Sequence, residues 1–124
     1  MIRFYKIKAW LLYRLKAKSR HGVHSPFAYH FSEQVLYRKD RKQLRSRLVA
    51  YFEGWKLTWN KKQIEGATVD TVIIIEAVHD RAEHYEEWKR LSADPRVTLS
   101  IDIFDYGILL FRADFLQKQH FILK

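Results

Sequence analysis

The sequence contains no cysteine, and this absence removes two kinds of stabilising element. No disulfide can form and no thiolate can bind zinc, so the commonest structural metal sites are excluded. Long apolar runs are also missing. The longest candidate, residues 9–13, is closed by Lys8 and Arg14, whereas a membrane-spanning helix needs about 20 apolar residues. The same brevity leaves a secretory signal without its apolar middle, and we therefore expect a cytoplasmic protein.

Acidic residues are scarce in the first half of the chain. Residues 1–62 hold 16 Lys and Arg against 3 acids, a net charge of +13, whereas residues 63–124 hold 7 against 11, a net charge of −4. A basic surface of this kind can bind nucleic acid or an anionic membrane, but it can also attract the acidic half of the same chain. The charge distribution alone leaves these alternatives open.

Apolar residues are abundant enough for one packed core. They make up 48% of the 124 residues, and aromatic residues make up 15%, which argues against disorder despite the many charges. We therefore expect a single domain over residues 1–124. Its first part, residues 1–54, is basic and helical, and its second part, residues 55–124, has the pattern of a strand, a helix and a hairpin.

Three helices are predicted in the first part. Apolar side chains recur at three- and four-residue spacing near the amino terminus, with lysine and arginine between them, which is typical of an amphipathic helix ending near Ser19. A second helix is expected over residues 26–37 and a third over residues 41–53, with Gly54 as its left-handed terminator. The apolar stripe of the first helix consists of Phe4, Ile7, Leu11 and Leu15.

The second part predicts a small sheet. A β-branched run is typical of a strand covered on both faces, and Asp80 with Glu83 suits the start of the helix that follows it. An alternating segment and a second apolar run predict an antiparallel hairpin that turns at residues 105–107. The fold class is therefore α/β, with a sheet of three or four strands. Three strands are expected over residues 71–75, 97–103 and 108–111. Residues 55–59 form either a short strand or an extended connector, and residues 121–123 could add a last short strand.

Two passages carry a resemblance to a known family. Residues 16–27, with the motif HGVHSPF, and residues 96–112, followed by 118–121, resemble the opening and the ending of a group of bacterial class I S-adenosylmethionine methyltransferases. The resemblance implies a truncated Rossmann-like sheet, the β5-α-β6-β7 part of that fold, with the first helix packed over it. Further similar segments are 72–79 (the fifth strand and its exit), 86–88 (the following helix) and 47–52 (the helix before the first strand).

The cofactor-binding core of that family has no counterpart in this sequence. The resemblance implies a glycine-rich loop after the first strand and an acidic residue after the second. Gly54 and Gly66 are isolated, no G-x-G pattern occurs, and residues 59–69 leave no room for three further strand and helix units. Glu76 is followed by Ala77, where the family has a second acidic residue. We therefore expect no cofactor, with S-adenosylmethionine bound only if the chain is an active methyltransferase.

Glu76 and His79 are the candidate catalytic residues. They follow the most buried strand, at the sheet edge where ligands bind in α/β folds, and they could share a proton there. Glu76 could instead accept hydrogen bonds from the next turn or pair with a basic residue. His21 and His24 form a possible loop site. A metal would need further ligands and no carboxylate precedes Glu33, so we expect these histidines to be structural and no metal to be bound.

Three functions are compatible with these patterns. The first is a reduced, non-catalytic methyltransferase relative that acts as an interaction module, as a homodimer or with a complete methyltransferase homologue; the dimer is expected because a small sheet leaves exposed edges. The second is an active methyltransferase of unknown substrate that uses Glu76 and His79. The third is a basic protein that binds nucleic acid or an anionic membrane surface. We favour the first, because the residues that would hold the cofactor are missing.

Overall fold

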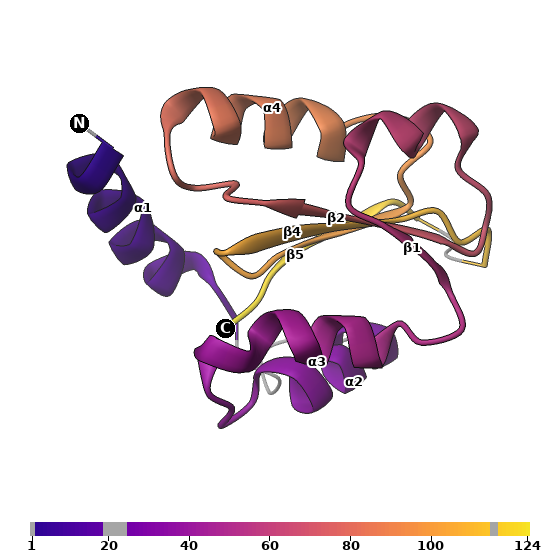
Figure 1. The fold of residues 1–124 in the computed structure, drawn as a ribbon, viewed down its shortest axis with the longest axis horizontal. Helices are drawn as coiled ribbons and strands as arrows, with labels where there is room; N and C mark the ends of the chain where they lie inside the picture. The colour runs from indigo at the N-terminus through magenta and orange to yellow at the C-terminus, as the bar shows by residue number, and fades with distance from the viewer. Residues whose placement is uncertain (1, 19–24, 115–116) are drawn as a thin grey trace.

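A computed structural model of the chain describes residues 2–18, 25–114 and 117–124. Within them, a five-stranded mixed sheet lies between helices on its two faces, as Figure 1 shows. The helical elements are α1 (Ile2–Lys16), α2 (Pro26–Phe31) with a π-helical turn (Ser32–Leu36), a 3-10 turn (Arg41–Gln43) leading into α3 (Leu44–Tyr51), a 3-10 segment (Lys61–Gly66) and α4 (Ala82–Ser92). The strands are β1 (Lys56–Thr58), β2 (Thr71–Glu76), β3 (Leu99–Asp102), β4 (Tyr106–Leu110) and β5 (Gln119–Ile122).

The sheet has the strand order β1-β2-β4-β3-β5. Strand β4 runs antiparallel to both of its neighbours, whereas β1 is parallel to β2 and β5 is parallel to β3. The predicted succession of strand, helix and antiparallel hairpin is confirmed as β2, α4, β3 and β4. The described residues contain one strand more than predicted, because both short flanking segments pair with the sheet.

Both faces of the sheet are covered. Alternation along β2 sends Val72 and Ile74 into a core shared with α2 and α3, and sends Ile73 into a second core beneath α4. Leu48 of α3 is fully buried in the first of these cores. The basic helical part and the strand part therefore share one apolar interior. The β-branched composition of β2 agrees with this two-sided burial, as the sequence predicts.

Gly107 was predicted to lie in the hairpin turn, and this was wrong. It lies in β4, where it pairs with Ile75 on one side and Asp102 on the other. A methyl group at this position would lie 2.4 Å from a ring carbon of Trp88, so the indole of α4 packs directly on bare backbone. The turn itself precedes β4 and contains Phe104 at a φ of 75°.

The predicted helix start at Asp80 was also wrong. The residue that precedes the first turn of α4 is Arg81, which is extended and makes no side-chain capping hydrogen bond. The Asp80 carboxylate instead lies 3.2 Å from the Lys6 ammonium of α1. Gly54 has the expected positive φ, 89°, but α3 ends at Tyr51 with Phe52 as its cap, so the glycine lies in the turn that follows the helix.

The outward orientation of α1 is the largest departure from expectation. The predicted stripe does not pack over the sheet, since Phe4 is 70% exposed and Leu15 is 83% exposed. Helix α1 lies at one end of the sheet (Figure 1) and turns its opposite face inward, where Tyr13 and Trp10 pack on Phe104. Aromatic rings bury more area than leucine side chains, which accounts for the choice of face. No helix in the described ranges is long and apolar enough to cross a membrane.

The outer edges of the sheet are formed by β1, which is short, and by β5, whose edge is partly covered. Strand β1 has only three residues. The edge of β5 continues into residue 18, since the Lys18 amide donates to the Ile122 carbonyl at 2.8 Å and the Lys124 amide donates to the Lys18 carbonyl at 3.1 Å. Short or covered edges are weak templates for pairing with another chain. The edge argument for a homodimer is correspondingly weaker, and the dimer stays a prediction.

Candidate functional site

The structure sends Glu76 and His79 to different neighbours. Glu76 ends β2 with a side chain that is 57% exposed, and its carboxylate lies 3.3 Å from the Arg45 guanidinium of α3. His79 belongs to the turn before α4 and is only 8% exposed. Glu76 thus takes the alternative that the sequence left open, a pair with a basic residue of the front half. To share a proton, Glu76 and His79 would have to be hydrogen-bonded to each other. Their described partners are instead Arg45 and Asp102.

His79 is held by a carboxylate that the sequence analysis missed. Its Nε2 atom lies 2.6 Å from Oδ2 of Asp102, the last residue of β3, and both side chains are buried. The imidazole is stacked parallel to Phe104, with ring centres 5.0 Å apart, and also packs on Tyr85 at 4.9 Å. The second Asp102 oxygen accepts a hydrogen bond from the Phe104 amide at 2.9 Å. Asp102 therefore joins the turn before α4 to the β3–β4 turn.

A cavity of about 280 Å³ lies between α1 and this histidine–aspartate pair. Its volume falls just below the range of about 300–1,000 Å³ that is usual for drug-sized ligands. Asp102 is the acid in its wall, and both of its oxygens already have partners within the protein. The cavity can therefore hold a small, largely apolar molecule. Residues in its wall include Lys8, Leu12, Tyr13, His79, Tyr85 and Asp102.

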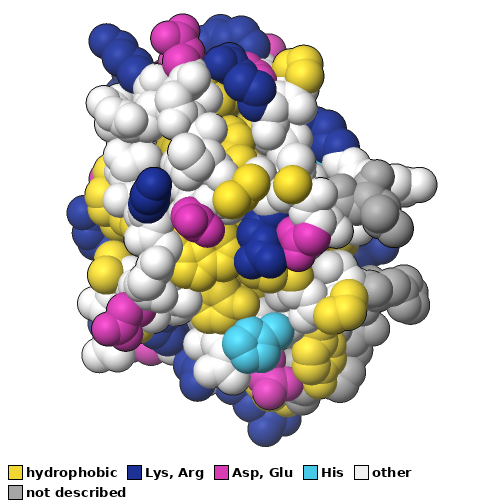
Figure 2. Space-filling model, turned by 90° about the vertical axis from the view of Figure 1, so that its right-hand side faces the viewer, with side chains coloured by type: hydrophobic (Ala, Val, Ile, Leu, Met, Phe, Trp, Pro, Cys, Tyr) yellow, Lys and Arg dark blue, Asp and Glu magenta, His cyan; other side chains and the backbone are white. Residues whose placement is uncertain are grey.

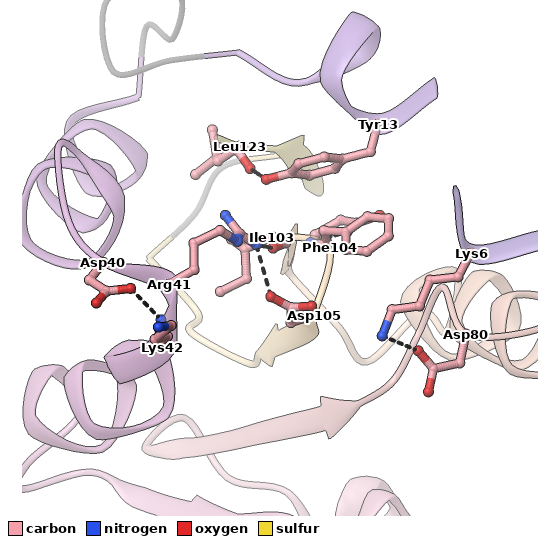
Figure 3. Close-up of polar contacts among 11 residues, drawn as sticks. Lys6, Tyr13, Asp40, Arg41, Lys42, Asp80, Ile103, Phe104, Asp105 and Leu123 are labelled. Atoms are coloured by element: carbon pink, nitrogen blue, oxygen red, sulfur yellow. Dashed lines mark hydrogen bonds and ion pairs between the residues drawn. The ribbon is translucent and has the colours of Figure 1, made fainter. Parts of the chain in front are cut away.

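A second, polar cleft of about 310 Å³ lies at the end of β2. Glu76 belongs to it, together with two ion pairs shown in Figure 3. Lys6 pairs with Asp80, and Arg41 lies 3.2 Å from Asp105 while also donating to the Ile103 carbonyl. The two cations and two carboxylates of these pairs cancel in charge, so they give the cleft no net charge that would attract an ionic ligand. The carboxyl edge of the sheet is thus polar but internally neutralised.

Tyr13 attaches α1 beside the cavity. Its hydroxyl donates to the Leu123 carbonyl, as Figure 3 shows, and its ring is nearly fully buried against Phe104. Burial raises the pKa of Tyr13 to about 12, since the phenolate would lose its hydration, while the nearby Arg41 guanidinium acts in the opposite direction. The phenol is therefore a structural hydrogen-bond donor at neutral pH.

Alkaline pH is expected to weaken this attachment. The folded state holds the Tyr13 proton up to a pKa of about 12, whereas an unfolded phenol ionises near pH 10, so the stabilisation is complete below about pH 10 and is lost between about pH 10 and 12. The loss should be on the order of 2 kcal/mol. Urea unfolding followed by tryptophan fluorescence across this range measures it. The control variant Tyr13→Phe has no phenol to ionise, so it should show a shallower decline; parallel declines in the two proteins would contradict the assignment.

The predicted loop site at His21 and His24 lies outside the described residues. The neighbouring His30 is described, and its Nδ1 atom lies 3.0 Å from the Tyr51 hydroxyl of α3. The described ranges contain no group of three or more histidine, aspartate or glutamate side chains with the arrangement of a metal site. His30 thus makes a side-chain hydrogen bond within the protein.

Comparisons with known proteins do not assign the chain to a family. No protein-family model, curated protein or solved structure matches it. The resemblance of residues 16–27 and 96–112 to methyltransferases therefore stays a prediction. The chemistry available to the site is that of its own residues, a buried histidine–aspartate pair beside a small cavity and a cleft of paired charges.

Proposed function

We propose that the chain is a reduced, non-catalytic relative of the class I methyltransferases, and that it acts as an interaction module through α1. The observation that carries this proposal is the apolar face that α1 turns outward, where Phe4, Ile7, Leu11 and Leu15 are each more than half exposed. Exposed apolar patches on otherwise closed domains mark sites of contact with another surface. Most of the other apolar side chains are buried in cores on both faces of the sheet, and exposed ones such as Val49 and Val69 lie on other segments than α1.

The order of elements supports the relationship to methyltransferases. The resemblance implies a buried strand, a helix and then an antiparallel hairpin, and β2, α4, β3 and β4 follow one another in this order. The parallel strand β1 extends the sheet on the far side of β2. In this interpretation, the five-stranded sheet is the surviving part of a Rossmann-like sheet. Fold and function separate easily, so this relationship says nothing about activity by itself.

Two features of the site support a role without catalysis. The candidate residues Glu76 and His79 are engaged by Arg45 and Asp102, respectively. The cavity beside His79 is small, and the carboxylate in its wall is already hydrogen-bonded. A class I methyltransferase holds its cofactor with backbone amides of a glycine-rich loop and with a free acidic residue. These groups have no replacement in the described cavity wall.

Calorimetric titration of the full chain with S-adenosylmethionine tests the proposal. We expect no heat beyond dilution at millimolar cofactor, because a nucleoside needs hydrogen-bonding groups that this chain does not supply. A complete class I methyltransferase, titrated under the same conditions, provides the positive control. Saturable heat, or transfer of a labelled methyl group by the purified chain, would support the active methyltransferase instead and would overturn the proposal.

A further inference from the structure

Helix α1 has an apolar outer face, formed by Phe4, Ile7, Leu11 and Leu15 and continued by Leu12, which also lies at the rim of the cavity beside His79. Each of these side chains is at least 46% exposed. At 3.6 residues per turn, they span an arc of about 140° on the side away from the buried Tyr13 and Ala17. The helix is therefore apolar on two opposite sides, one packed on the domain and one open.

Cations surround this outer face. Lys8 projects within the arc, and Arg14 and Lys16 lie at its two borders on the helical wheel; all three are exposed. Residues 1–32 contain no aspartate or glutamate at all. The end of the molecule away from α1 differs, since Figure 2 shows acidic and basic side chains side by side there. The open apolar face of α1 thus lies on a helix that carries cations and no acidic residue.

Charge decides between two occupants of the outer face. A second copy of α1, packed symmetrically on the first, would bring the rim cations of both helices together, because an isologous contact places the same patch on both partners. Like charges opposed in this way disfavour association. An anionic lipid surface offers phosphate groups for the cations and acyl chains for the apolar side chains. With 15 residues and a length of about 22 Å, α1 is too short to span a bilayer and suited to lie along its surface.

We propose that the outer face of α1 docks the protein on membranes that contain anionic phospholipid. Phe4, Leu11 and Leu15 enter the boundary between headgroups and acyl chains, while Lys8, Arg14 and Lys16 contact lipid phosphates. Tyr13 and Trp10 hold the opposite side of the helix against the domain. The inference rests on the proposed function, since it names the partner of the same helix.

Co-sedimentation of the full chain with lipid vesicles tests this inference. Vesicles of phosphatidylcholine alone are compared with vesicles that also contain about 30% phosphatidylglycerol, an anionic lipid. We expect binding to the anionic vesicles, at least about tenfold weaker binding to the neutral ones, and a marked decrease of binding as salt screens the rim cations. Absence of binding to the anionic vesicles at low salt would overturn the inference.

Two variants separate the apolar and the ionic contributions. The triple variant Phe4→Ser, Leu11→Ser and Leu15→Ser should lose about a hundredfold in vesicle affinity, because each lost side chain removes apolar area from the contact. The double variant Val49→Ser and Val69→Ser removes exposed apolar side chains elsewhere and should bind like the wild type. The triple variant Lys8→Gln, Arg14→Gln and Lys16→Gln should lose about tenfold or more, since each cation near an anionic membrane contributes to binding.

A charge-matched control completes the set. The variant Lys39→Gln, Lys42→Gln and Lys62→Gln removes three exposed cations outside α1 and should lose less than the α1 variant. Equal losses in the two cation variants would reduce the effect to net charge and would overturn the assignment to α1. Equal vesicle binding by the serine variant and the wild type would overturn it as well.

Sedimentation equilibrium of the same proteins tests the second copy as occupant. A wild-type dimer that becomes monomeric in the α1 serine variant, without vesicle binding, would overturn the membrane inference and leave the interaction module standing. Binding of S-adenosylmethionine would instead remove the proposed function, whatever the vesicles show. The two failures are therefore distinguishable.

Discussion

Replacing Trp88 by alanine is expected to lower the free energy of unfolding by about 3–5 kcal/mol, a large part of the total stability of a domain of this size. The indole is 1% exposed and fills the core between α4 and the sheet, against Ile73 and Leu109. Alanine would leave a cavity that the flat surface of β4 has no side chain to fill, because Gly107 lies directly beneath the ring. Urea denaturation followed by far-ultraviolet circular dichroism measures the loss.

A double-mutant cycle with Gly107→Ala provides the control. In the wild type, the new methyl group would lie 2.4 Å from a Trp88 ring carbon, so overpacking should cost about 1–3 kcal/mol. With Trp88 already replaced by alanine, the same methyl group meets no indole and should cost much less. Additive losses in the double variant would show that the two residues do not contact each other.

The second large effect is expected at Asp102. Its replacement by alanine removes the partner of His79 Nε2 and the acceptor of the Phe104 amide, and both groups are left largely shielded from solvent. A buried donor or acceptor left unsatisfied costs about 1–3 kcal/mol, so the loss of partners for both groups should cost about 2–6 kcal/mol. Because Phe104 also carries α1, the variant should lose near-ultraviolet circular dichroism from Trp10 and Tyr13 together with stability.

Two substitutions serve as controls for Asp102. Asp102→Asn keeps the shape and an acceptor for the Phe104 amide, so it should lose less than half of what the alanine variant loses. Asp114→Ala breaks the exposed pair with Arg112 and should leave stability almost unchanged. If Asp102→Ala lost no more stability than Asp114→Ala, the buried pair of His79 and Asp102 would not stabilise the fold.

The sheet was largely accessible to prediction because its patterns are local. The run at residues 71–75 is β-branched throughout, and only a strand covered on both sides needs that composition. The hairpin followed from the alternation of residues 97–103 and the apolar run after it. The position of Gly107 within a strand was not predicted, because a glycine that follows Asp105 and Tyr106 is typical of a turn. Its small size is required by Trp88, 19 positions away, and no local rule contains that contact.

The placement of α1 was beyond the reach of periodicity. The spacing of Phe4, Ile7, Leu11 and Leu15 indicates which side chains share a face, but it does not indicate whether that face meets the core. Two aromatic residues, Trp10 and Tyr13, occupy the other side, and their larger area decides the inward face. A comparison of aromatic with aliphatic content on the two sides of the helix would have pointed to this outcome.

The candidate site was found in part. Glu76 and His79 were correctly predicted to follow the buried strand, at the carboxyl end of β2. Their partners could not be predicted, because tertiary packing determines them. Asp102 lies 23 residues beyond His79 and reaches it because β4 pairs with both β2 and β3. Asp102 is one of the polar positions that alternate with Leu99 and Ile101, and only the covering of that second face of β3 by tertiary packing buries it and gives it a partner.

The clamp between Lys18 and the end of β5 has a consequence for biosynthesis. Ribosomes synthesise α1 well before β5, the strand whose end fixes residue 18. During that interval both apolar sides of α1 are exposed, and the nascent chain is prone to aggregation or to binding by chaperones. Fixation of residue 18 therefore has to wait for β5, and it joins two segments that are made far apart in time.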